Sequence, residues 1–164
     1  MMRRLCLTMA MVLLAAAAAR AQDLGIEVGA RAPGAMVETL DGKRVDLARY
    51  LDGRPALIEF WAAWCTNCKA LEPQLVSLHE QYGDKLRLIA VAVSINQSPQ
   101  RARLYAERHA LPMTVLYDRK GDAAVAYDAP ATSFIVLVDA RGRIAYTGVG
   151  AEQKLEEAVK KIMR

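Results

Sequence analysis

The stretch Phe60–Lys69, FWAAWCTNCK, decides how this chain folds. An apolar run, Ala56–Trp61, leads into two cysteines separated by two residues, and apolar residues at helical spacing follow them as far as Tyr82. This order predicts a buried strand, a short loop and a helix, with Cys65 at the helix N-terminus. The unpaired backbone N–H groups and the helix dipole at such an end favour a thiolate. A Cys-x-x-Cys pair placed there can open and close a disulfide, so the stretch predicts thiol–disulfide chemistry.

The first 21 residues are typical of an export signal. Two arginines precede an apolar run, Leu5–Ala19, and a cleavage site of A-x-A type follows at Ala19–Ala21. The apolar run is shorter than the roughly 20 residues that a membrane-spanning helix needs, which argues against a retained anchor. We therefore expect a signal peptide over 1–21 and one mature domain over 22–164. The mature protein would be periplasmic, or otherwise exported, and soluble.

Removal of this signal changes both the charge and the cysteine count. The loss of three arginines leaves 19 of the 22 basic residues against 18 acidic ones, so no excess of positive charge suggests nucleic acid as a partner. Cys6 leaves with the signal, and a domain of this size needs no structural disulfide. His79 and His109 lack ligand-like spacing to the remaining cysteines, so we expect no metal site. We also expect a monomer.

Strands and helices alternate along the chain in an order that predicts an α/β sheet covered on both faces. Strands are expected over Ala35–Leu40, Arg44–Leu47, Ala56–Trp61, Leu86–Val93, Met113–Tyr117, Phe134–Val138 and Arg143–Thr147. Helices are expected from the cysteines to about Gly83, over 99–110, in a short segment ending near Ala126, and near the C-terminus through Leu155, Val159 and Ile162. The unbroken apolar character of several strands is typical of strands buried on both faces.

The chain resembles the thioredoxin superfamily, and within it the exported TlpA/ResA-like reductases, from about Gly29 to the end. The resemblance rests on the active-site string Phe60-Trp61-Ala62-x-Trp64-Cys65-x-x-Cys68, Pro73 after it, Ala32-Pro33 and Leu40-Asp41-Gly42-Lys43 before it, and Asp139-x-x-Gly142-Arg143-Ile144 near the end. It implies a thioredoxin-like fold: a central mixed β-sheet flanked by helices, with an N-terminal β-hairpin and a central αβ insertion over about Ser94–Asp118.

Cys65 is the expected attacking nucleophile because of its place at the helix N-terminus. By the resemblance it is also the more exposed sulfur, and Cys68, one turn on, would be the resolving thiol. Such a cysteine pair could alternatively form a structural disulfide or supply half of the ligands of a zinc site. Thr66 and Asn67, between the cysteines, would tune the redox potential. Trp64 would shield Cys65 and offer an apolar platform to a substrate.

Glu59 interrupts an apolar strand six residues before Cys65. Alternation places its side chain opposite Ile58 and Phe60, toward a helix-covered face, where a carboxylate is costly without partners or a function. We expect Glu59 to have a raised pKa and to accept the proton of Cys68, although a solvated position at a sheet edge would also fit the pattern.

The sequence departs from the family at the proline that normally lies beside the dithiol with a cis peptide bond. Counting without gaps places Ser133 at that position, with Thr132 before it. The nearby proline, Pro130, comes three residues earlier and follows Ala129. Our hypothesis is that Pro130 is the cis residue; the alternative is that Thr132 and Ser133 contact the substrate without a proline.

Three functions are consistent with these residues. The first is an exported dithiol reductase, with no cofactor beyond its redox-active disulfide. By the resemblance it would act in cytochrome c or copper-site maturation and receive electrons from a membrane donor of CcdA/DsbD type. The second is a disulfide oxidase or isomerase, since the same dithiol serves either direction. The third is a copper-binding chaperone of Sco type, against which the absence of a Cys-x3-Cys spacing and of a histidine near residues 127–134 argues.

Overall fold

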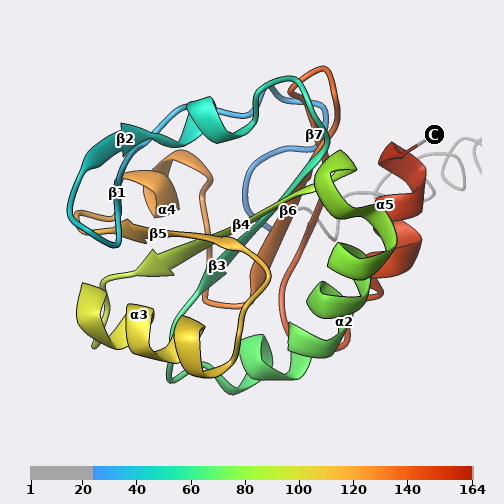
Figure 1. Cartoon of the computed structure of the whole chain (residues 1–164). Coiled ribbons are helices and arrows are strands. Elements are labelled where there is room, and N and C mark those ends of the chain that lie inside the picture. The colour runs from blue at the N-terminus through green and yellow to red at the C-terminus, as the bar shows by residue number, and fades with distance from the viewer. Residues whose placement is uncertain (1–23, 164) are drawn as a thin grey trace, which may run out of the picture.

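The computed structural model describes residues 24–163 and places seven strands in one mixed sheet, in the order β2-β1-β5-β4-β3-β6-β7 (Figure 1). The strands are β1 (Met36–Thr39), β2 (Arg44–Asp46), β3 (Ala56–Trp61), β4 (Arg87–Val93), β5 (Thr114–Asp118), β6 (Phe134–Val138) and β7 (Ile144–Gly148). The helices are α2 (Thr66–Tyr82), α3 (Pro99–Arg108), α4 (Asp122–Ala126) and α5 (Leu155–Ile162), with short 3-10 turns η2 (Leu47–Tyr50) and η3 (Gly83–Lys85). The predicted elements are confirmed, most of them within one or two residues.

β3 lies at the centre of the sheet because its sequence has almost no polar interruption. It pairs in parallel with β4 and antiparallel with β6, and all six of its residues are buried. β5 pairs in parallel with the outer side of β4 and antiparallel with β1, so the predicted αβ insertion extends the sheet and joins it to the N-terminal hairpin. The thioredoxin-like architecture inferred from the motifs is therefore the one observed.

Two apolar cores cover the two faces of the sheet. On one face Leu57 of β3 packs with Leu71 and Leu75 of α2 and with Leu155 of α5. On the other face the ring of Phe60 packs against Tyr127 at the end of α4, with their centroids 5.6 Å apart. Each of these side chains contributes roughly 1.5 to 3 kcal/mol when fully buried. Together they fix the end of β3, and with it the loop that carries the cysteines.

The predicted signal peptide, residues 1–21, lies outside the residues that the structure describes. Within 24–163, none of the helices combines the length and the apolar character needed to cross a bilayer.

Candidate active site

The cysteine pair lies where β3 passes into α2, as the strand–loop–helix pattern predicts. Cys65 is the N-cap of α2, and its sulfur accepts a hydrogen bond from the backbone N–H of Cys68 at 3.1 Å. The two sulfurs form a disulfide. Once this bond is reduced, a Cys65 thiolate has a backbone donor and the positive end of a 17-residue helix beside it.

Burial does not separate the two cysteines as the resemblance implied. Cys65 is 7% exposed and Cys68 is 5% exposed, so Cys65 is only marginally the more accessible residue. What distinguishes them is position, since Cys65 caps the helix and Cys68 lies inside its first turn. Thr66 and Asn67 are exposed on that turn, where a substrate could contact them.

Glu59 lies beneath the first turns of α2. Leu57, on the same face of β3, packs with Leu71 and Leu75. Because α2 runs back over β3, and a strand rises about 3.3 Å per residue against 1.5 Å for a helix, the position two residues along the strand lies about four residues earlier on the helix. That geometry places Glu59 under residues 67–71 of α2, the stretch that contains Cys68.

The environment of Glu59 favours its neutral form. The residue is 3% exposed, and its Oε1 atom has no hydrogen-bond partner among the described residues. Burial first, and the negative charge of Glu72 second, raise the pKa of Glu59 to about 8. The predicted helix-covered position is confirmed and the solvated edge position is wrong.

An apolar hollow of about 320 Å³ borders Trp64, the residue before Cys65, although neither cysteine lines it. Trp64, which is 42% exposed, forms one wall, and its indole N–H donates to the carbonyl oxygen of Ile95 at 2.9 Å. Ala129, Pro130 and Thr132 also line the hollow. The remaining lining residues are Val93, Ser94, Ile95, Asp118, Gly121, Ala124 and Ala131. The structure thus brings Trp64 together with three of the four residues expected opposite the dithiol.

The hypothesis that Pro130 is a cis residue is wrong. Every peptide bond in residues 24–163 is trans, including the one before Pro130. The chain turns into β6 through left-handed backbone at Asp128 (φ 46°) and Ser133 (φ 61°), so the reversal needs no cis bond.

Ser133 directly precedes β6 but is not available to a substrate. It is 1% exposed, its hydroxyl accepts from the Gly150 N–H at 3.1 Å, and its carbonyl oxygen accepts from Gln153 Nε2 at 3.0 Å. These bonds tie Ser133 to the segment between β7 and α5. Of the two residues in the alternative hypothesis, Thr132 is therefore the one that borders the hollow.

Sequence reasoning missed two acidic residues near the site. Glu72 follows Cys68 by four residues and so lies on the same side of α2, a spacing that could have indicated it. Asp118 ends the apolar strand β5 and is fully buried; Oδ2 accepts from the Ala124 N–H at 2.9 Å, whereas Oδ1 has no partner among the described residues. Burial raises the pKa of Asp118.

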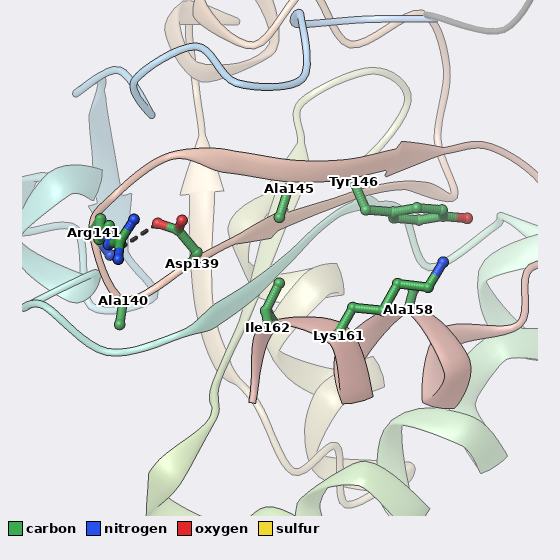
Figure 2. A pocket seen from close by; sticks show the side chains of 8 residues that line it. All are labelled: Asp139, Ala140, Arg141, Ala145, Tyr146, Ala158, Lys161 and Ile162. Carbon is green, nitrogen blue, oxygen red and sulfur yellow. Dashed lines mark hydrogen bonds between the residues drawn. The ribbon is translucent and has the colours of Figure 1, made fainter. Parts of the chain in front are cut away.

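A second hollow, of about 390 Å³, lies between the β6–β7 turn and α5 (Figure 2). Lys161 extends along it toward the side of Tyr146, and Asp139 marks its other end (Figure 2). Asp139 comes directly after the last residue of β6. The dithiol lies toward the other end of this strand, where the first residue is Phe134. This hollow is therefore remote from the cysteines.

Comparison with known proteins identifies the family. The model of the AhpC/TSA family matches residues 28–147. The chain belongs to this family. It is 32% identical over 136 residues to the thioredoxin-like protein YneN of Bacillus subtilis, covering 82% of this chain and 79% of that protein. It is 25% identical over 139 residues to the thiol-disulfide oxidoreductase ResA of Bacillus thuringiensis, covering 84% and 79%.

Solved structures agree with the observed fold. A Chlorobium tepidum structure assigned as the thiol:disulfide interchange protein DsbE superposes with a TM-score of 0.75 at 22% identity, covering 85% of this chain and 99% of that one. A Neisseria meningitidis structure assigned as a thioredoxin gives 0.68 at 30% identity, covering 80% and 86%. With the Cys65–Cys68 pair at the N-terminus of α2, this AhpC/TSA-family chain is a thioredoxin-like thiol–disulfide oxidoreductase.

Proposed function

We propose that the protein is an exported dithiol reductase for protein disulfides, released after cleavage of residues 1–21. The observation that carries this proposal is the Cys65–Cys68 pair at the start of α2 with the buried Glu59 beneath it. Thr66 and Asn67, the two residues between the cysteines, are uncharged. They do not supply the positive charge that would stabilise the thiolate as strongly as a potent oxidant requires. Cytochrome c or copper-site cysteines are the proposed substrates, and a membrane dithiol of CcdA/DsbD type the proposed electron donor.

The reaction follows from the positions of the three groups. The Cys65 thiolate attacks one sulfur of the substrate disulfide, forms a mixed disulfide and releases the other substrate sulfur as a thiolate. Cys68 then gives its proton to the carboxylate form of Glu59, and its sulfur attacks Cys65 Sγ. The Cys65–Cys68 disulfide forms, and the second substrate sulfur leaves as a thiolate. Two electrons pass to the substrate, and the membrane donor must restore the dithiol.

Trapping decides between this function and its rivals. Cys68→Ser should leave Cys65 linked to its substrate, because the resolving thiol is gone. We expect mixed disulfides recovered from the native host to contain cytochrome c or copper-site proteins, with Cys65→Ser as the control that traps nothing. Recovery only of proteins whose disulfides are being formed would favour the oxidase. Stoichiometric Cu(I) binding by the wild-type dithiol without any trapped protein would favour the chaperone.

The wall formed by Trp64 should contribute to substrate binding. Trp64→Ala removes an exposed indole that borders the hollow, and we expect kcat/KM for a peptide disulfide to fall about 5- to 30-fold, on the order of 1 to 2 kcal/mol of lost apolar contact. Val76→Ala is the matched control, because Val76 is 38% exposed on the third turn of α2, outside the hollow. Steady-state assays of both variants measure the effect, and equal losses would contradict a binding role.

A further inference from the structure

A polar bridge joins α2 to α3 close to the resolving cysteine. The Tyr105 hydroxyl donates to Glu72 Oε1 at 2.6 Å, and Nδ1 of His109 lies 3.0 Å from Glu72 Oε2. The rings of Tyr105 and His109 stack with centroids 3.9 Å apart. Tyr105 also packs against Trp61, which fixes the bridge to the end of β3. Both oxygens of Glu72 are thus held in one place.

The position of this bridge relates it to the chemistry of Cys68. Glu72 follows Cys68 by one helical turn, its carboxyl group contacts α3, and its side chain is only 18% exposed. Glu59 lies beneath the same turns, with one oxygen unpartnered. The negative charge of Glu72 disfavours a second carboxylate nearby, and it raises the pKa of Glu59.

We propose that Glu72, held by Tyr105 and His109, is a positioning residue that keeps the proton of Cys68 on Glu59 once the disulfide has formed. The retention of the Cys68 proton during disulfide exchange rests on the proposed function. The effect of the Glu72 charge on Glu59 does not. In the oxidised protein the cysteines have no proton to exchange, so a proton taken from Cys68 must remain on Glu59 or pass to water. A neighbouring carboxylate favours the first outcome, and loss of its charge favours the second.

The charged and titratable groups around Glu59 are few. On α2 these are Glu72 and, from the spacing of strand and helix, Cys68; on α3 they are Tyr105 and, behind Glu72, His109. Burial, the Glu72 hydrogen bond and the two carboxyl groups raise the pKa of the Tyr105 phenol, so this phenol stays a donor.

The test is a titration of Glu59 in the oxidised protein, followed by NMR of its carboxyl carbon. Glu72→Gln should shift the midpoint down by about 0.5 to 1 pH unit, since one nearby charge is removed. Tyr105→Phe keeps the ring against Trp61 but frees Glu72 to turn toward solvent, so a smaller downward shift is expected. Glu80→Gln, exposed on α2 beyond this face, is the matched control and should leave the midpoint unchanged.

The outcomes separate this inference from the proposed function. An unchanged Glu59 midpoint in folded Glu72→Gln, or a shift in Glu72→Gln with none in Tyr105→Phe, would overturn the role of the bridge even if Cys68→Ser traps substrates. Failure to trap any protein would instead overturn the reductase function and leave the titration result standing. With wild-type-like unfolding temperatures in the variants, the shift cannot come from a general loss of structure.

Discussion

Between pH 4.5 and 8 the oxidised protein is expected to lose on the order of 4 kcal/mol of its free energy of unfolding because of Glu59. The carboxyl group ordinarily loses its proton near 4.5, whereas burial and Glu72 raise the pKa of Glu59 to about 8 in the folded protein. Between these values the native state binds one proton more than the unfolded state. Stability therefore falls by about 1.4 kcal/mol per pH unit and levels off above pH 8.

Glu59→Gln isolates this contribution, because glutamine keeps the shape and cannot titrate. The measurement is urea unfolding at pH 4.5, 6, 8 and 9, at constant ionic strength and with the disulfide intact. At each pH, the free energy of unfolding of the variant is subtracted from that of the wild type. Other groups, including the buried Asp118 with its raised pKa, cancel in this difference. Parallel curves for the two proteins would show that Glu59 ionises normally, and Glu80→Gln should follow the wild type throughout.

The sequence predicted the centre of the fold because the decisive signals there are local. An unbroken apolar run specified β3, and the change from strand to helical periodicity at the cysteines specified the start of α2. The position of Glu59 followed from the two-residue period of a strand whose neighbours are all apolar. These features depend on residues close in sequence, and each was found where it was expected.

The wall opposite the dithiol and the α2–α3 bridge depend on contacts that a single sequence does not display. Ser133 takes its left-handed backbone because Gly150 and Gln153, some 20 residues later, hold it there. The spacing of Pro130 could not reveal that this tie replaces a cis bond. Glu72 and Tyr105 are 33 residues apart, and only the packing of α3 against the end of β3 brings them together.

The largest kinetic effect is expected from Glu59→Gln on the second step of disulfide exchange. Reduced protein mixed with 5,5′-dithiobis(2-nitrobenzoate) releases one coloured thiolate when Cys65 attacks and a second when Cys68 displaces the group held on Cys65. We expect the first release to stay within about twofold of the wild type. The second should slow about 100-fold at pH 7, in the range typical of a lost general base.

The separation of the two phases makes the role of Glu59 specific. A general disturbance of α2 would slow both releases, because the helix N-terminus stabilises Cys65 as well, whereas a lost proton acceptor affects the step in which Cys68 must ionise. Cys68→Ser should release a single equivalent and so identify the second phase, and Glu80→Gln should leave both unchanged. A second phase with wild-type rate and pH profile in Glu59→Gln would mean that water, rather than the buried carboxyl group, takes the proton of Cys68.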